Sequence, residues 1–339
     1  MDLIRDLLGE EKLNYLGYSY GTWLGAWYAS LFPERVGRMV LDSYIDFSRP
    51  LDIIAPQIPA RQRALDEILI PYAVRHARHF QLGTSEAAVR THMANLSPRM
   101  QHTIAVPLLL TAYKRDGADQ FLEVIAIARE LDQLFTTMPK PLDRATAEKA
   151  AQRLPFIRRD AERKAGRQVI AQRLLASYFE TLPHPRREGL DMDFNASTYA
   201  AIRCNDAPAS TDLTAWEKQL QDAAERAPHF FFGLYNNTCA TWVRPDLKQP
   251  DPTPLQSLDL MLVQSQYDVA TPVEGANAFF ARLPRAFRVY VPGELERGLF
   301  PYRDRNCVDL TVTRYLLGEP PAQRETVCSA LPLEQDARK

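Results

Sequence analysis

Hydrophobic and polar positions alternate between helical and extended spacing over residues 1–46. Apolar side chains at helical spacing, followed by a glycine, predict a short first helix: Leu3, Ile4, Leu7, Leu8 and Gly9. The apolar segments 13–18 and 36–42 are rich in Val, Leu and Tyr and predict strands, and the segment 22–36 predicts a helix ended by Pro33. This order predicts a βαβ unit with parallel strands and a right-handed crossover.

The long middle of the chain, residues 47–235, has a different pattern. Helical periodicity dominates segments such as 84–96, 117–135 and 144–154, prolines separate the segments, and no strand pattern recurs. This part is interpreted as a helical insertion.

Residues 236–339 return to alternating strands and helices. Apolar and amphipathic segments predict strand, helix, strand and helix, in the order 257–268, 271–283, 287–293 and 307–319. Thr271 is the expected N-cap of the first of these helices, and Gly318 is expected just past the end of the second. The chain is therefore expected to be α/β, with 1–46 and 236–339 forming the core.

Composition excludes several classes of protein. The chain has 339 residues, 46% hydrophobic and 24% charged, with a net charge of −1, which is typical of a globular protein and gives no electrostatic reason to expect a nucleic acid or an anionic membrane as partner. No apolar run approaches the ~20 residues that span a bilayer. The N-terminus has early acidic residues and no small-residue cleavage site, so it does not read as a signal peptide.

The four cysteines contain no CxxC pair, which argues against a zinc or dithiol redox site. The sequence alone leaves two interpretations open. The cysteines are buried free thiols, or they form the disulfides Cys204–Cys239 and Cys307–Cys328. No metal or other cofactor is expected.

One motif carries chemistry. Ser19 stands between two glycines in Gly17-Tyr18-Ser19-Tyr20-Gly21, directly after a predicted strand and at the start of a predicted helix. That context is typical of a nucleophile elbow, in which small neighbours permit a sharp turn from strand to helix. The alternative is a glycine-rich turn with an incidental serine. Asp268 follows a later strand, the place where folds with a nucleophile elbow have the acid of the catalytic triad. The alternative is that Asp268 is a solvated loop residue that caps the next helix.

The segments NYLGYSYGTWLGAWYASLFPERVGRMVLD, AIRCNDAP, CATW, SQYDVATPVEGANAFFARLP, CVDLTVTRYLLGEPP and TVC together resemble the tripeptidyl-aminopeptidase-like branch of the α/β-hydrolases. These proteins are relatives of proline iminopeptidases and are mostly secreted bacterial exopeptidases. The resemblance implies an α/β-hydrolase fold with residues 47–235 as a helical cap domain, Ser19 as nucleophile and Asp268 as triad acid. It also favours the two disulfides, a peptide or small acyl substrate, and a secreted or periplasmic location, with a cytoplasmic one as the alternative.

The first departure from the family pattern concerns the catalytic histidine, which falls in a Gly-His-Gly-like turn after the strand that here is 287–293. The matching residue is Arg297, before Gly298, and its guanidinium stays protonated and cannot act as a base. Loss of the histidine from a serine triad costs on the order of a millionfold in turnover. The six histidines are interpreted as surface or partly buried residues outside this turn, with His229 the least implausible substitute: His76, His79, His92, His102, His184 and His229.

The second departure is at the N-terminal part of the fold. In the family, four strands and a His-Gly-Gly-type oxyanion loop normally precede the elbow strand. The sequence starts at the helix before the elbow and has no Gly-Gly pair, so only the Tyr20 amide is expected as an oxyanion donor. Losing one such donor costs about a hundred- to a thousandfold. Segment 13–18 is then an open, apolar sheet edge, and a covering element is expected: a cap segment, a symmetric partner or a separately encoded N-terminal half.

Three hypotheses remain open at this point. The first is an impaired serine hydrolase of the aminopeptidase type, cleaving short peptides from a free N-terminus. The second is a truncated, non-catalytic relative that acts as a binding or interaction module. The third is that the start is misplaced and an upstream segment restores the sheet and the oxyanion hole, but not the residue at Arg297.

Overall fold

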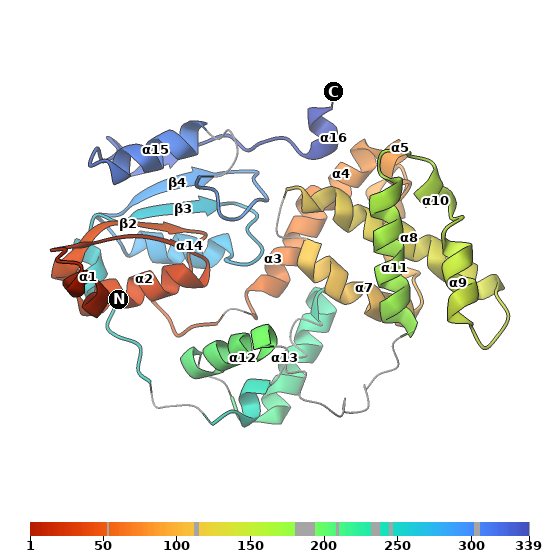
Figure 1. The fold of residues 1–339 in the computed structure, drawn as a ribbon, viewed down its shortest axis with the longest axis horizontal. Coiled ribbons are helices and arrows are strands. Elements are labelled where there is room, and N and C mark those ends of the chain that lie inside the picture. Colours follow the sequence, from red (N-terminus) through yellow and green to blue (C-terminus); the bar gives the residue numbers. More distant parts are fainter. Residues whose placement is uncertain are drawn as a thin grey trace.

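The computed structural model describes residues 1–52, 54–111, 115–179, 194–207, 210–231, 238–243, 247–301 and 306–338. Figure 1 shows a lobe built on a twisted sheet beside a larger group of helices that the chain forms between the second and third strands. The predicted α/β class is confirmed.

The sheet of the described structure has five strands in the order β1-β2-β3-β4-β5, and each neighbouring pair is parallel. The strands are β1 (Leu13–Tyr18), β2 (Val36–Asp42), β3 (Met261–Ser265), β4 (Phe287–Val291) and β5 (Glu325–Val327). Four of them match predicted segments. The short β5 was not predicted, because three residues give too little pattern to recognise. Parallel pairing brings the carboxyl ends of β1, β2 and β3 to one edge of the sheet, where ligands bind in open α/β folds.

Helices cover both faces of the sheet (Figure 1). On one face, α2 (Tyr20–Leu31) and α14 (Val273–Ala281) pack through Trp23 and Phe279 against Leu41 and Leu262. On the other face, α15 (Asn306–Leu316) packs through Val312 against the strands. Because both faces are covered, β3 is buried along its whole length, which explains the apolar run Met261, Leu262 and Val263 at its start.

The inserted helices form a second hydrophobic core. Its elements are α3 (Gln57–Ala64), a π-helical turn (Leu65–Leu69), α4 (Ile70–Arg75), α5 (Ala77–Phe80), α6 (Glu86–Ala94), α7 (Pro98–Thr111), α8 (Gly117–Thr137), α9 (Arg144–Ala151), α10 (Pro155–Arg158), α11 (Lys164–Phe179) and α13 (Leu213–Arg226). The insertion also includes α12 (Phe194–Asp206). The long α8 lies at the centre, with Phe121, Ile125 and Leu131 fully buried. The predicted helical character of 47–235 agrees with these elements, and its C-terminal boundary lies outside the described residues.

Both chain ends pack in ways that the sequence pattern did not predict. The first helix, α1 (Asp2–Leu7), turns its apolar residues outward, with Leu3 69% and Leu7 77% exposed. The last helix, α16 (Glu334–Ala337), contacts the inserted helices, where the backbone N–H of Gln335 donates to the Tyr72 hydroxyl at 2.9 Å. Strand β1 forms the edge of the described sheet next to α1.

Single-turn 3₁₀ helices occupy Pro33–Arg35, Thr238–Thr241 and Thr253–Ser257. Among the residues that the structure describes, no helix is both long enough and apolar enough to cross a membrane.

Candidate active site

Ser19 occupies a strained turn between β1 and α2. Its backbone has φ 54° and ψ −121°, in the region of positive φ that side chains other than glycine rarely adopt. The turn needs a glycine before the serine, because a Cβ on Gly17 would lie 2.6 Å from the Gly21 carbonyl oxygen. The Ser19 amide donates to the Asp42 carbonyl at 3.1 Å, which fixes the turn to the end of β2.

The Tyr20 amide is at the first position of α2, where a helix offers amide groups without acceptors of its own. It therefore has the position that an oxyanion donor requires in a nucleophile elbow. The Tyr20 hydroxyl donates to the carboxylate of Asp206 in α12, which ties α12 to the elbow.

Asp268 lies in the loop after β3 and is fully buried. One carboxylate oxygen accepts from the Ala270 and Thr271 amides, both at 2.8 Å, and the other accepts from the Thr271 hydroxyl at 2.7 Å. The alternative of a solvated loop aspartate is therefore wrong. The predicted N-cap role of Thr271 is also wrong: Pro272 is at the N-cap of α14, and the Thr271 hydroxyl is used by Asp268.

A second buried acid, Asp42, was missed by sequence reasoning. It ends β2 and accepts from the Phe300 amide at 2.8 Å, while its neighbour Ser43 accepts from the Gly298 amide at 2.8 Å. Burial, with the negative charge of Asp268 adding to it, raises the pKa of Asp42 to about 7. An aspartate that directly ends an apolar strand was the signal available in the sequence.

The Asp42–Phe300 and Ser43–Gly298 hydrogen bonds hold the segment after β4, which includes Arg297, against the end of β2 beside the elbow. A cavity of about 340 Å³ is lined by Ser19, Tyr20, Ile45, Gln57, Tyr199, Ile202, Arg203, Ala270, Thr271 and Arg297. The structure thus brings Ser19 and Arg297 to one cavity, and Asp268 lies behind its Ala270–Thr271 wall.

None of the histidines that the structure describes lines this cavity. His76 contacts Asp336 at 2.6 Å, His79 lies 3.8 Å from Asp119, and His92 lies 3.3 Å from Arg129. Burial lowers the pKa of His229, whose charged neighbours are Asp66 and Arg90 of the helical insertion. His184 falls outside the described residues.

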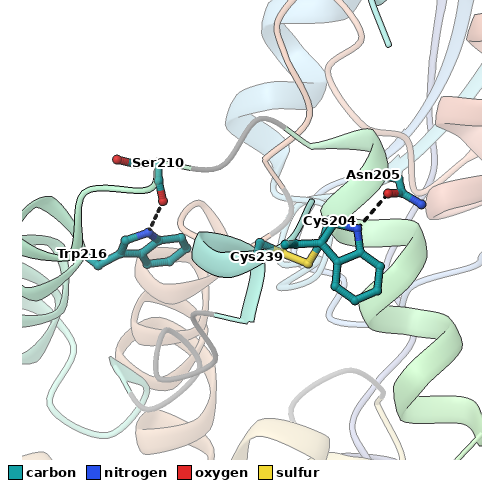
Figure 2. The surroundings of a disulfide bond; sticks show 6 residues. Cys204, Asn205, Ser210, Trp216 and Cys239 are labelled. Carbon is teal, nitrogen blue, oxygen red and sulfur yellow. Dashed lines mark hydrogen bonds between the residues drawn. A yellow bond between two sulfur atoms is a disulfide. The ribbon is translucent and has the colours of Figure 1, made fainter. Parts of the chain in front are cut away.

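Both cysteine pairings implied by the family resemblance are present in the structure. Cys204–Cys239 has Cα atoms 5.0 Å apart, and Cys307–Cys328 has them 5.8 Å apart. Figure 2 shows the first disulfide, with Asn205 next to Cys204. The Trp242 indole donates to the Asn205 side chain at 2.8 Å. This cross-link joins α12, which supplies Tyr199, Ile202 and Arg203 to the cavity, to the segment Thr238–Thr241.

A larger cavity of about 610 Å³ adjoins the first and shares Ile45, Gln57, Ala270 and Thr271 with it. Its acidic lining residues have partners. Asp46 contacts Arg49 at 3.0 Å, Glu274 pairs with Arg63, and Asp52 accepts from two backbone amides at 3.1 Å.

In the described part of the chain, no group of three or more His, Cys, Asp and Glu side chains is placed to hold a metal ion.

Comparison with known proteins gives two family matches. Residues 1–121 match the family described as alpha/beta hydrolase fold, and residues 231–328 match the family described as TAP-like protein. The two matches cover the two parts of the chain that form the sheet.

Whole-chain relatives are longer than this sequence. The tripeptidyl aminopeptidase of Streptomyces lividans is 26% identical over 339 aligned residues, which cover 97% of this chain and 57% of the relative. The serine protease Hip1 of Mycobacterium tuberculosis is 27% identical over 329 residues, covering 94% of this chain and 58% of the relative. Carboxylesterase B of the same species is 29% identical over 140 residues, covering 38% of this chain and 26% of the relative. The chain thus spans somewhat more than half the length of the first two relatives.

Proposed function

The chain belongs to the TAP-like branch of the α/β-hydrolases, and we propose that it is a serine hydrolase of the peptidase type whose activity is impaired at one position of its triad. The observation that carries this proposal is that Ser19, strained at the strand-to-helix turn, shares a cavity with Arg297. A strained backbone at such a turn is a feature that proteins keep where function requires it.

In the proposed reaction, the Ser19 hydroxyl attacks the carbonyl carbon of a peptide bond, the C–N bond breaks, and the amine leaves with the serine proton. Water then hydrolyses the acyl-enzyme to the carboxylic acid and restores the Ser19 hydroxyl. The Tyr20 amide stabilises the negative charge on the carbonyl oxygen. Asp268 has the role of the triad acid, which orients a base and stabilises its protonated form. The base is the missing part, because Arg297 cannot accept the serine proton.

The finer proposals follow the relatives' names and the architecture. The chain acts on short peptides from a free N-terminus, and residues 47–235 form a cap that limits access to Ser19. Two disulfides support a secreted or periplasmic location, because disulfides persist in oxidising compartments.

A second candidate function is a non-catalytic binding module. Arg297 at the position of the base favours it, since one substitution removes turnover and leaves the cavity in place.

Labelling with a fluorophosphonate probe separates the two functions. The chain is compared with Ser19→Ala, with Arg297→His and with Ser257→Ala, a control at an exposed serine outside the cavity. Labelling that disappears only in Ser19→Ala supports the hydrolase, and labelling that appears only in Arg297→His supports a site impaired at that one position. Silence of both the chain and Arg297→His, with folding confirmed by circular dichroism, overturns the hydrolase and leaves the binding module.

A further inference from the structure

We propose that the segment 331–336 is a strap that positions the loop of Asp268 from the far side of the inserted helices. The strap holds one end of a helical rod, residues 57–75, and the other end of the rod holds the loop. This inference goes beyond the proposed function and does not depend on it, because it concerns the position of the loop and requires no reaction of Ser19.

The rod consists of α3, the π-helical turn and α4, which follow one another without a break. At 1.5 Å per residue it is about 28 Å long. Pro71 accounts for the wide turn in its middle, because proline has no N–H for the carbonyl four residues earlier. Figure 1 shows α3 beside the sheet lobe and α16 near the other end of the rod.

The rod contacts the loop on both sides of Asp268. The Gln57 side chain donates to the Ala270 carbonyl at 2.9 Å. Glu67, in the π-helical turn, accepts from the Tyr267 hydroxyl at 2.7 Å. Tyr267 and Ala270 flank Asp268 in the chain, so the two hydrogen bonds attach the loop to the rod at two points. Gln57 also lines the cavity of about 340 Å³, so a shift of the rod changes the wall of the site.

The strap holds the other end of the rod. The Gln335 backbone N–H donates to the Tyr72 hydroxyl of α4 at 2.9 Å. The Gln335 side chain donates to Asp119 in α8 at 2.8 Å. Asp336 pairs with Arg75, in the last turn of α4, at 3.0 Å. Tyr72 and Gln335 are both buried, so their hydrogen bond is shielded from water.

The strap is also attached to the sheet lobe. The Leu331 amide donates to Glu294, in the segment after β4, at 3.2 Å. Just before the strap, Cys328 is joined to Cys307 of α15, and its amide donates to the Tyr290 carbonyl of β4 at 2.9 Å. The strap therefore connects the sheet to the far end of the rod, and the rod connects back to a loop of the sheet. Contiguous contacts of this kind carry coupling between distant sites.

The Glu67–Tyr267 hydrogen bond lies near the middle of the rod and gives it a pivot. When the strap is released from α4, the rod turns about this bond, and Gln57 at the opposite end moves away from the Ala270 carbonyl. The loop then loses one of its two attachments to the rod.

Hydrogen–deuterium exchange followed by mass spectrometry tests the proposal on the full chain and needs no catalytic activity. The reporter is the peptide that contains the Ala270 and Thr271 amides, which donate to Asp268. Asp336→Ala and Gln335→Ala are each expected to speed exchange of this peptide about tenfold, because exchange reports local opening of the loop.

A double-mutant cycle tests whether the rod makes the connection. Gln57→Ala alone is expected to speed exchange of the reporter peptide about as much as Asp336→Ala, since it removes the same contact. Adding Asp336→Ala to Gln57→Ala is expected to contribute less than about twofold more, because changes that act through one contact are not additive. The control Arg338→Ala, at the end of α16, removes a side chain that pairs with Glu162 outside the rod, and is expected to change nothing.

Unchanged exchange of the reporter peptide in Asp336→Ala or in Gln335→Ala overturns the proposal. Full multiplication of the two effects in the double variant overturns the rod as the connection. An equal acceleration in the peptides of α11, or in the control Arg338→Ala, would mean a general loosening of the insertion and also overturns it. Labelling of Ser19 tests the hydrolase separately, so the failure of either idea leaves the other in place.

Discussion

Asp42 and Asp268 behind the elbow, and Asp119 and Glu123 in the inserted helices, are all buried carboxylates, but they have different partners. Glu123 accepts from Arg167 at 2.7 Å and from Arg163 at 2.8 Å, and Asp119 contacts Arg163 at 3.1 Å. In the described part of the chain, the donors to Asp42 and Asp268 are neutral amides and hydroxyls.

The difference in partners indicates two uses of buried carboxylates. Those in the insertion hold helices together, and those behind the elbow suit a functional site. In the insertion, arginines neutralise the carboxylates and join α8 to α11, an arrangement that fixes helices. Behind the elbow, neutral donors do not offset the cost of burial, so the pKa of Asp42 is raised to about 7. The neighbouring backbone has positive φ at both Ser19 and Ser43, 54° and 56°. Backbone strain and a perturbed carboxyl cost stability and are kept where chemistry needs them.

The largest expected effect removes an arginine from the insertion. Arg167 is 1% exposed, so Arg167→Leu leaves the Glu123 carboxylate buried beside a single remaining arginine, and the free energy of unfolding is expected to fall by about 3–5 kcal/mol. Urea unfolding followed by circular dichroism measures it. The control Arg144→Gln breaks an exposed pair with Glu148 in α9 and is expected to cost less than about 1 kcal/mol. A loss in Arg167→Leu as small as that of the control would mean that the insertion does not depend on its ion pairs.

The next effect concerns the protonation of Asp42. Its pKa is raised to about 7 from 3.8, so between about pH 4 and 7 the folded chain holds a proton that the unfolded chain has lost. This acid therefore favours the fold at low pH, and its contribution is lost as pH rises through about 7. Asp42→Asn mimics the protonated acid. The free energy of unfolding of the parent chain is expected to fall relative to Asp42→Asn by on the order of 2–4 kcal/mol between pH 5 and pH 8. Parallel pH profiles of the two chains would show that Asp42 is ionised throughout.

The contrast between the two regions also explains what the sequence could predict. Strands β1 to β4 and the helices of the insertion follow local periodicity, and they agree with the structure because burial on one or both faces dictates those patterns. The turn at Ser19 follows from its glycine motif between a strand and a helix. Asp268 was found through its place after a strand, and the solvated alternative failed because the loop Asp268–Thr271 turns back to supply its own donors.

The remaining features depend on contacts between distant segments. Asp42 joins the site through contacts with distant segments: Phe300, 258 residues away in the chain, donates to its carboxylate, and the Ser19 amide donates to its carbonyl. Arg203 lines the cavity because a disulfide and the Tyr20–Asp206 bond place α12 there. Local pattern contains no information on such pairs, and the three-residue β5 and four-residue α16 are too short to have a period.

A smaller effect tests the geometry of the elbow itself. A Cβ on Gly17 meets the backbone of Gly21 at 2.6 Å, whereas a Cβ on Gly21 has its nearest neighbour, the Tyr15 hydroxyl oxygen, at 3.4 Å. Gly17→Ala is therefore expected to lower the free energy of unfolding by about 1–3 kcal/mol, since a backbone contact cannot relax cheaply. Gly21→Ala is expected to be neutral or mildly stabilising, because alanine favours the helix that starts there. Equal losses in the two variants, measured by urea unfolding, would argue against the turn as described.

The smallest effect measures the strain stored at Ser19. With φ 54° and ψ −121°, the residue has a conformation that glycine adopts without steric cost, whereas alanine keeps the strain of the serine. Ser19→Gly is expected to be more stable than Ser19→Ala by about 1 kcal/mol, even though glycine loses more conformational entropy on folding. The comparison uses two variants that both lack the hydroxyl, so the difference in their free energies of unfolding reports the backbone alone. If alanine is the more stable residue, the turn relaxes in solution and stores no backbone strain at Ser19.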